Sequence, residues 1–337
     1  MEKKKIRFGI LGCGAIARFH ADAISRIENA VLIGVADALV EGAQRFAQEY
    51  QVKAYASYQE MLQDDMIDAV CICTPSGFHG ENAMEALRAR KHVVLEKPMA
   101  FTRAETSAIE AEVKKSGCVL TVICQLRFSE DVRYVRQLLA DNALGELVFC
   151  DLYMKYWRDQ AYYASSNWKG TRRFDGGGAL MNQGIHGIDL LLYLVGGAKV
   201  VYAKNSTRFH DIEVEDASIA MLEFDNGAMG VIEGSTCVSP GFERRLEING
   251  TKGSVVLVEN RIRKLVINGE TLIDRQSGPV NGAASNPMAF ACDLHMVQLM
   301  NFIDAIYGDG ELLITAAEGA KAVALIEDIY QFGLQRR

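Results

Sequence analysis

The first 125 residues alternate short apolar runs with helical segments, and this alternation restricts the fold more than any other feature. The apolar runs occupy residues 6–11, 31–36, 69–73, 93–95 and 119–124, and a short extra strand is expected near Ala54. Helical character follows at residues 16–26, 39–49 and 81–89, and Thr102 and Glu105 form a capping-box pattern that opens a helix to residue 115. Uniformly apolar strands followed by helices predict a parallel sheet covered on both faces.

After about residue 126 the pattern changes to one typical of an antiparallel sheet. A strand is expected at residues 147–155, and a glycine-rich helix start at Gly176. Further strand-like runs are separated by turns at Asn226-Gly227, Asn249-Gly250 and Asn268-Gly269. Helices at residues 288–307 and 315–332 end the chain. We therefore expect two domains, residues 1–125 and residues 126–337, with the last helix a candidate to pack back on the first domain.

Composition excludes several classes of protein. A chain of 337 residues is long for a single core, which also favours two domains. The net charge of −7 argues against a general nucleic-acid binder. Neither a secretory signal nor a membrane span is expected, because no long apolar run is present. The eight cysteines include no C-x-x-C pair and are interpreted as reduced thiols of a cytoplasmic protein, with no metal site expected.

The stretch "FGILGCGAIARFH" predicts a dinucleotide site. Gly12, Gly14 and Ala17 have the G-x-G-x-x-A spacing between a strand and a helix, which lets the backbone approach a diphosphate at the helix N-terminus. Asp37 ends the next strand and would accept hydrogen bonds from a ribose. Because Ala38 and Leu39 follow it instead of a basic residue, the sequence favours NAD over NADP. The alternative is a tight turn that binds no ligand.

Two further loops should reach the same edge of the sheet. Thr74 and Pro75 follow the third apolar run, and His79 opens the next helix as a cofactor contact or as a capping or core histidine. In "HVVLEKPMA", Glu96 and Lys97 follow a central strand, and Pro98 fixes a turn for which a cis peptide bond is plausible. Lys97 should therefore point to the nicotinamide, and the alternative is a surface salt bridge with Glu96.

The stretch "FDGGGALMNQGIHGIDLLLYLVGG" predicts the other half of the site. Wound as a helix from Ala179, it places Asn182, His186 and Asp189 on one face of an otherwise apolar helix. Such a polar stripe is either a satisfied buried network or an active site. We favour the active site for His186 and a structural role for Asp189.

A basic and aromatic stretch precedes that helix, in "KYWRDQAYYASSNWKGTRRF". Asp159 is its one acid. Its bases are Lys155, Arg158, Lys169, Arg172 and Arg173, and its aromatic residues are Tyr156, Trp157, Tyr162, Tyr163 and Trp168. The combination fits a lip that binds an anionic, flat or ringed substrate, and the alternative is a solvated loop.

Together "GILGCGAIA", "TPSGFH", "EKP" and "GIHGIDLL" resemble, over essentially the whole chain, the glucose–fructose oxidoreductase, inositol dehydrogenase and rhizopine-catabolism (Gfo/Idh/MocA) family. The resemblance implies an α/β protein with an N-terminal Rossmann domain, a C-terminal α/β domain with a large open, mainly antiparallel sheet, and NAD(P)-dependent oxidation of sugars or cyclitols. It also implies that Lys97 and His186 are the catalytic pair.

Asn182 departs from the aspartate that many members carry four residues before the catalytic histidine. Together with "YYASSNWKGT", it makes the chain similar to the branch that oxidises C3 of UDP-linked N-acetylglucosaminuronate. The expected substrate contacts are Lys97, Tyr163, Trp168, Arg172, Asn182 and His186. The expected cofactor contacts are Gly12, Gly14, Ala15, Ile16, Ala17, Asp37, Thr74, Pro75, His79, Glu96, Lys97 and Gln125.

Other functions stay open at this point: an inositol or free-aldose dehydrogenase, a non-catalytic NAD-binding sensor, or a lyase or epimerase that uses NAD transiently. We expect a small sugar-type substrate and neither a nucleic-acid nor a membrane partner. A homodimer or homotetramer is expected, because the free face of the second sheet needs a cover.

Overall fold

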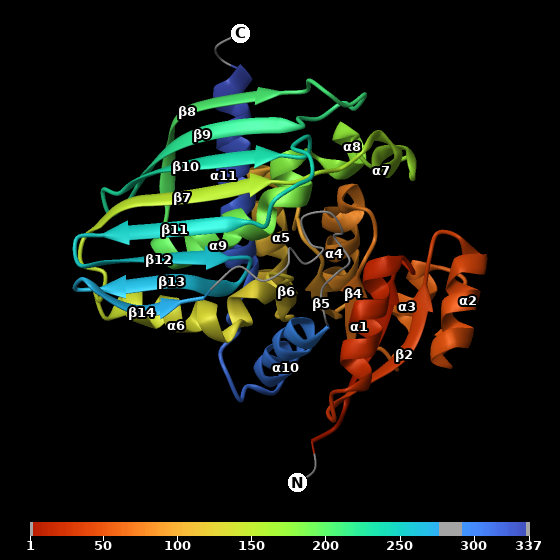
Figure 1. Cartoon of the computed structure of the whole chain (residues 1–337). Coiled ribbons are helices and arrows are strands. Elements are labelled where there is room, and N and C mark those ends of the chain that lie inside the picture. Colours follow the sequence, from red (N-terminus) through yellow and green to blue (C-terminus); the bar gives the residue numbers. More distant parts are fainter. Residues whose placement is uncertain (1–2, 276–291, 335–337) are drawn as a thin grey trace. The chain divides into compact units, whose positions relative to one another are not determined.

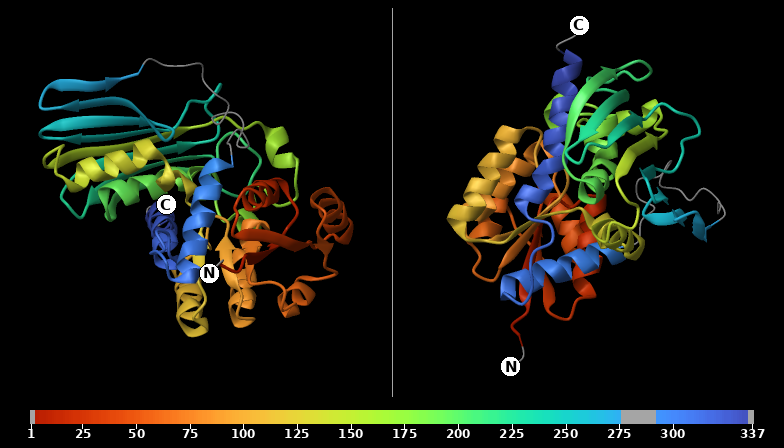
Figure 2. Two further views of the ribbon diagram at one scale, coloured as in Figure 1. Left: turned by 90° about the horizontal axis from the view of Figure 1, so that it is seen from below. Right: turned by 90° about the vertical axis from the view of Figure 1, so that its left-hand side faces the viewer.

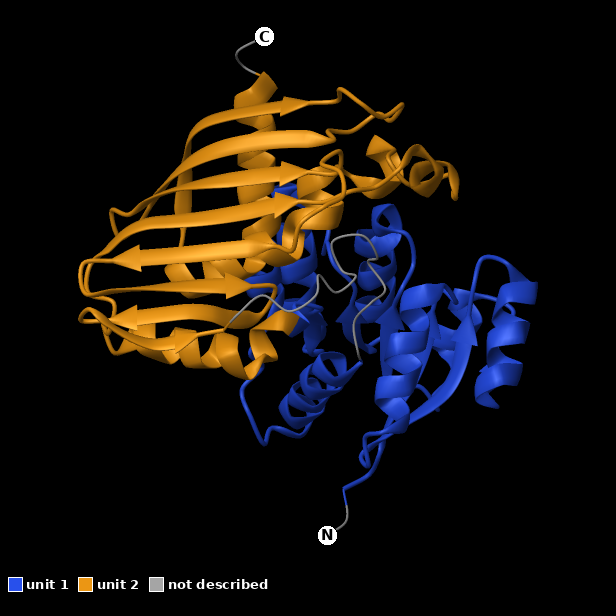
Figure 3. Cartoon of the chain, viewed as in Figure 1, with its two compact units in different colours: residues 1–125, 291–320 blue, residues 126–290, 321–337 orange. Residues whose placement is uncertain are grey.

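The computed structural model describes residues 3–275 and 292–334. The chain forms two compact units, which Figure 3 distinguishes by colour. Unit 1 comprises residues 1–125 and 291–320, and unit 2 comprises residues 126–290 and 321–337. Each unit is built around a sheet of its own (Figure 1).

Unit 1 contains a six-stranded parallel sheet in the order β3-β2-β1-β4-β5-β6. Its strands are β1 (Ile6–Leu11), β2 (Ala30–Ala36), β3 (Lys53–Ala54), β4 (Ala69–Ile72), β5 (His92–Leu95) and β6 (Leu120–Val122). The central strands β1, β4 and β5 are almost wholly buried, which requires helices on both faces. Because the strand order reverses beside β1, the crossovers that follow β1 and β4 lie on opposite faces. The predicted parallel sheet is confirmed.

The helices of unit 1 begin and end at local signals. They are α1 (Ala15–Ser25), α2 (Val40–Tyr50), α3 (Tyr58–Gln63), α4 (His79–Arg88), α5 (Arg103–Ser116) and α10 (Asp293–Tyr307), with a 3₁₀ turn, η1 (Ser76–Phe78), before α4. The capping box of Thr102 and Glu105 is present at the start of α5, as predicted. Helix α3 was not predicted, because six residues are too few to show a helical period. Ser57 caps it by accepting a hydrogen bond from the Glu60 N–H.

Helix α10 completes unit 1 from far along the chain. Leu299, Phe302 and Ile303 join the core formed by β1 and α1, and the rings of Phe302 and Phe8 are 6.3 Å apart. The side-chain amide of Gln298 accepts from Cys124 N at 3.2 Å and donates to Val122 O at 2.7 Å, so it satisfies backbone groups at the edge strand β6. Residues 288–291 of the predicted helix lie outside the described residues.

Unit 2 contains an eight-stranded sheet in the order β14-β13-β12-β11-β7-β10-β9-β8. Every neighbouring pair is antiparallel except β7 and β10, so the prediction of a mainly antiparallel sheet is confirmed. The strands are β7 (Leu147–Lys155), β8 (Ala198–Ser206), β9 (Ala217–Phe224), β10 (Met229–Ser235), β11 (Arg245–Gly250), β12 (Gly253–Val258), β13 (Arg261–Ile267) and β14 (Glu270–Asp274).

Two of the three predicted Asn-Gly turns are present. Asn226-Gly227 joins β9 to β10, and Asn268-Gly269 joins β13 to β14 with φ of 51° and 81°. The prediction for Asn249-Gly250 is wrong, because both residues belong to β11 and the turn follows at residues 251–252. Glycine is needed at position 250 for a different reason: a Cβ there would collide with the carbonyl oxygen of Leu144.

Helices cover one face of the second sheet. They are α6 (Glu130–Ala140), the π-helical turn η3 (Ala179–Gly184), α9 (Ile185–Val195) and, from residue 321, α11 (Ala316–Leu334); two short helices, α7 (Gln160–Ala164) and α8 (Arg172–Asp175), lie in the loop after β7, and the 3₁₀ turn η2 (Gln125–Phe128) precedes α6. Figure 2 shows α6 and α9 running along this face. Side chains that alternate to the other face, among them Ile219, Met221 and Met229, are exposed.

The predicted helix start at Gly176 is wrong. Gly176 instead ends α8, at φ 71°, and the next helical residue is Ala179. Among the described residues, no helix has the length and apolarity that a membrane span requires.

Candidate active site

The predicted cofactor contacts of unit 1 come from successive turns at one edge of its sheet. Gly12 follows β1, Asp37 follows β2, Thr74 follows β4, Lys97 follows β5 and Gln125 follows β6. The carboxyl ends of parallel strands meet at a common edge, and open α/β sheets bind ligands outside it. The fold therefore brings together residues that are far apart in the sequence.

The glycine turn leaves room for a diphosphate. Gly12 has φ 89°, and a Cβ there would lie 2.8 Å from the backbone of Cys73. Gly14 is the N-cap of α1, and a Cβ there would meet no atom within 4 Å among the described residues. The N–H groups of the first turn of α1, at Ala15, Ile16 and Ala17, have no intrahelical acceptor. No side chain caps this turn in the described structure, so an anion fits there.

Asp37 fits its predicted contact with a ribose. Its Oδ2 accepts from Cys13 N at 2.7 Å and its Oδ1 accepts from Leu39 N at 2.8 Å, which fixes the carboxylate beside the glycine turn. Each oxygen keeps a second lone pair for a hydroxyl donor. Leu39 is 72% exposed where a 2′-phosphate would need a base.

His79 connects two turns at this edge. Its Nδ1 lies 2.7 Å from Pro98 O and its Nε2 lies 2.9 Å from Thr74 O, and the side chain is buried. Burial lowers the pKa of His79. Since both ring nitrogens face backbone carbonyls, His79 would influence a cofactor by holding these turns. The Lys97–Pro98 peptide bond is cis, as the sequence suggested.

Glu96 is buried and forms an ion pair with a residue of α1. Its Oε1 lies 2.9 Å from Nε2 of His20, and its Oε2 accepts from Lys97 N at 3.2 Å. Burial alone would raise the pKa of Glu96, but the hydrogen bond and charge of His20 outweigh it and lower the pKa to about 2. The alternative of a surface salt bridge with Lys97 does not describe this carboxylate, which is 5% exposed.

A second buried histidine lies beside that pair. Nε2 of His295 in α10 is 4.0 Å from Oε1 of Glu96, and ligand atoms of His20, Glu96 and His295 lie within 4.8 Å of one another. Burial and the charge of His20 lower the pKa of His295 to about 4, so it is neutral at physiological pH. Because His20 already neutralises Glu96, we interpret the cluster as a support for the backbone at Lys97. Sequence patterns could not reveal it, since its members come from three separate segments.

Gln125 presents an acceptor with no partner. Its side chain is buried, and Oε1 makes no hydrogen bond within the described residues. A buried amide oxygen without a donor is costly. A carboxamide or ribose hydroxyl at this edge would supply the missing donor.

In unit 2 the predicted site helix begins with a π turn. The carbonyl of Gly178 accepts from both Asn182 N and Gln183 N, at 3.3 Å each. A π turn takes up an extra residue, so side chains before and after it do not follow α-helical periodicity. Asn182 therefore does not keep the α-helical spacing that was expected to align it with His186 and Asp189. Asn182 donates to Asp175, whereas Asp189 pairs with Arg127 across 2.6 Å, a contact that fits the structural role expected for Asp189.

Arg158 is the base of the aromatic stretch that reaches the site helix. It is buried, its Nε donates to Oε1 of Gln183 at 3.1 Å, and its guanidinium lies 5.5 Å from the ring centre of Tyr162. Gln183 also donates to the Tyr162 hydroxyl at 3.0 Å. Gln183 was not singled out from the sequence, because a glutamine in an apolar helix carries no specific signal.

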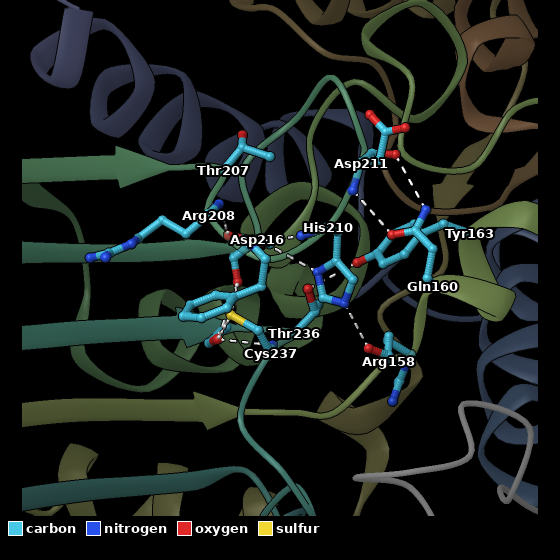
Figure 4. A network of polar contacts seen from close by, with 12 residues as sticks. Arg158, Gln160, Tyr163, Thr207, Arg208, His210, Asp211, Asp216, Thr236 and Cys237 are labelled. Carbon is cyan, nitrogen blue, oxygen red and sulfur yellow. Dashed lines mark hydrogen bonds and ion pairs between the residues drawn. The ribbon is translucent and has the colours of Figure 1, made fainter.

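Figure 4 shows polar contacts that hold the loop between β8 and β9, residues 207–216. Asp216 accepts from the backbone N–H groups of residues 208–210, and the ring of His210 connects Asp216 to Arg158 O, at 3.2 Å and 2.8 Å. The hydroxyl of Tyr163 donates to Oγ1 of Thr236 at 2.9 Å. Tyr163 itself is buried. This loop and the aromatic stretch line an open pocket of 370 Å³, whose residues include Tyr163, Lys169 and Glu213.

The other bases of the stretch differ from Arg158. Lys155 pairs with Glu233 on the sheet at 2.6 Å, so it does not belong to a lip. Arg172 is exposed and its Nε donates to Glu213 O at 3.0 Å. Trp168 is half-buried, and the ammonium group of Lys169 lies 6.0 Å from its ring centre.

Comparison with known proteins identifies the family. The model of an oxidoreductase family with an NAD-binding Rossmann fold matches residues 6–124, and the model of the GFO/IDH/MocA C-terminal domain matches residues 132–256. The chain belongs to the Gfo/Idh/MocA family of oxidoreductases. The fold, the NAD cofactor and the oxidoreductase class expected from the sequence are thereby confirmed at the level of the family.

The relatives include sugar and inositol dehydrogenases. The WlbA dehydrogenase of Bordetella pertussis, crystallised with NADH and UDP-GlcNAcA, is 31% identical with a TM-score of 0.88, covering 98% of this chain and 97% of its own. Myo-inositol 2-dehydrogenase of Thermotoga maritima is 26% identical, covering 79% of each chain. D-glucoside 3-dehydrogenase of Escherichia coli is 26% identical, covering 98% of this chain and 96% of its own.

Proposed function

We propose that the protein is an NAD-dependent dehydrogenase that oxidises a ring hydroxyl, at C3, of an anionic and nucleotide-linked sugar. The observation that carries the proposal is the likeness to WlbA over 98% of the chain, because that enzyme was crystallised with a UDP-linked sugar acid. Asn182 and the buried Arg158 support it, since an amide removes a repelling charge and a guanidinium binds anions bidentately.

His186 and Lys97 carry the proposed chemistry. His186 takes the hydroxyl proton as general base, and Lys97, as an ammonium, hydrogen-bonds the same oxygen and stabilises the developing alkoxide. Bound NAD would accept the hydride. The His20–Glu96 pair fixes the backbone next to Lys97, through the bond from Lys97 N to Glu96 Oε2.

A reduction screen tests the proposal. NADH formation is followed with UDP-sugar acids, their neutral UDP-sugars, free aldoses and inositols, at low and high salt. We expect turnover to be fastest with the anionic nucleotide sugar, and KM for it to rise with salt. Arg158→Ala should raise that KM by roughly 10–100-fold, the loss expected for charged hydrogen bonds. Arg261→Ala, at an exposed base of β13 outside the aromatic stretch, is the matched control.

Equal use of a neutral sugar, with KM unaffected by Arg158→Ala, would refute the anionic substrate and favour an inositol or free-aldose dehydrogenase. The inositol 2-dehydrogenase relative keeps that candidate in the screen. Substrate conversion without net NADH would indicate the lyase or epimerase, and NAD binding without any turnover would indicate the sensor.

We also propose that the exposed face of the second sheet pairs with another copy of the chain. Met229 pairs with Phe149 and Val231 with Met221 in the strand register, so apolar side chains are contiguous across β7, β10 and β9. Phe149, Met221 and Met229 are about half exposed. Analytical ultracentrifugation should show a dimer or tetramer that Met221→Lys weakens.

A further inference from the structure

The π turn before His186 is held by one buried acid. Glu215 lies between β8 and β9. Its Oε2 accepts from Gly178 N and its Oε1 accepts from Leu180 N, both at 2.9 Å, while its backbone oxygen accepts from Ala179 N at 3.0 Å. Three successive N–H groups at the start of a helix, which have no intrahelical acceptor, are therefore satisfied by a single residue.

Tyr330 of α11 supports Glu215 from the other side. Its hydroxyl donates to Oε1 of Glu215 at 2.7 Å. Burial raises the pKa of Tyr330 well above its ordinary value, so the hydroxyl stays protonated and can donate. Burial also raises the pKa of Glu215, against the hydrogen bonds from Leu180, Gly178 and Tyr330, which favour the carboxylate.

Glycine is required next to Glu215 and Tyr330, at positions 177 and 178, because a side chain there would collide with them. A Cβ on Gly177 would collide with the hydroxyl of Tyr330, and a Cβ on Gly178 would collide with the backbone oxygen of Glu215. Gly176 and Gly178 are needed for different reasons. Gly176 ends α8, and the absence of a Cβ at Gly178 allows Glu215 to contact the start of η3. Packing around Glu215 and Tyr330 therefore requires glycine at positions 177 and 178.

We propose that Glu215, supported by Tyr330, is a positioning residue that fixes the π turn Ala179–Gly184 and thereby the register of Asn182 relative to His186. The inference rests on the proposed function of His186. A π turn adds one residue to the helix, so its loss would rotate Asn182 with respect to α9 by about one residue, or 100°. A displacement of about 1 Å at a reacting group can lower a rate about 100-fold.

The kinetic test uses Glu215→Gln and Tyr330→Phe in the full chain. The two carboxylate oxygens of Glu215 accept hydrogen bonds from Gly178 N, Leu180 N and the Tyr330 hydroxyl. Glutamine has one acceptor oxygen, so its NH₂ group, which is a donor, must face at least one of these donors.

We expect kcat for the sugar to fall about 10–100-fold in Glu215→Gln and less in Tyr330→Phe. KM for the sugar should rise, because Asn182 is an expected sugar contact, whereas Kd for NAD should be nearly unchanged. Glu223→Gln, an exposed acid of β9, makes the same chemical change and should keep wild-type kcat.

Hydrogen exchange provides a readout that is independent of activity. Amides of residues 176–184 should exchange at least about tenfold faster in Glu215→Gln, with the rest of the chain unchanged. Wild-type kcat, or unchanged exchange of this segment, in a folded Glu215→Gln protein would overturn the inference. Should that variant not fold, Tyr330→Phe decides by the same two measurements. If the wild-type protein turns over no sugar, the proposed function fails, while exchange still reports whether Glu215 holds the turn.

Discussion

Removing one partner of the buried pair of Arg127 and Asp189 should strongly destabilise unit 2. Nε and Nη2 of Arg127 donate to the two carboxylate oxygens at 3.0 Å and 2.6 Å, and the side chains are 1% and 4% exposed. Replacing Asp189 with leucine removes a carboxylate that accepts two hydrogen bonds from the buried guanidinium. The expected loss is about 3–5 kcal/mol of unfolding free energy.

Urea unfolding followed by tryptophan fluorescence measures this loss, because both tryptophans, Trp157 and Trp168, belong to unit 2. The double variant Arg127→Met/Asp189→Leu should recover most of it, since no charge remains buried. Glu233→Gln is the control. Its pair with Lys155 has the same 2.6 Å separation, but the side chains are 41% (Lys155) and 32% (Glu233) exposed, so the loss should be at most about 1 kcal/mol. A loss below about 1 kcal/mol for Asp189→Leu, or a double variant as unstable as the sum of its singles, would refute the reasoning.

Three further predictions concern the site of unit 1 and the catalytic pair. Lys97→Ala and His186→Ala should each lower kcat by roughly 10²–10⁴-fold with Kd for NAD retained, and near-normal turnover in either folded variant would remove that residue from the pair. The protein should use NAD at least about tenfold better than NADP by kcat/KM, and Asp37→Ala should narrow that ratio; a preference for NADP contradicts the role of Asp37. The pKa of Glu96, lowered from 4.5 to about 2, should contribute about 3 kcal/mol of stability that is present above about pH 5 and lost as the pH falls towards 2. Glu96→Gln should flatten that part of a stability–pH curve, and an unaltered curve would contradict the pKa.

Features fixed by neighbouring residues were predictable, and features fixed by distant ones were not. The capping box of Thr102 and the glycine turn at Gly12 depend on residues a few positions apart, so their patterns survive in the sequence. The π turn depends on Glu215 and Tyr330, which no periodicity relates to Gly178. The winding of an ideal α-helix from Ala179 was wrong for that reason.

The candidate site shows the same division. The strand order places the turns after β1, β4 and β5 at one edge, and topology rules suffice to predict this. The contacts of individual side chains cannot be predicted in this way, because they depend on tertiary packing. Of the five bases in the aromatic stretch, Arg158 is buried beside Gln183 whereas Arg172 is exposed. The two arginines could not be distinguished from the composition of the stretch.

The division of unit 1 into two stretches of chain has a consequence for synthesis of the protein. Residues 1–125 leave the ribosome before Gln298 and Phe302 are synthesised. The edge of β6 and part of the core around Phe8 therefore lack their contacts until residues 291–320 have been made. At ordinary elongation rates the synthesis of the intervening residues takes roughly 10–40 s. During that time the nascent unit exposes an incomplete core and an unpaired strand edge, which are the features that chaperones bind. A truncated chain ending at residue 125 would keep them exposed permanently and should aggregate. A fusion that appends residues 291–320 would supply α10, which completes the core and contacts β6.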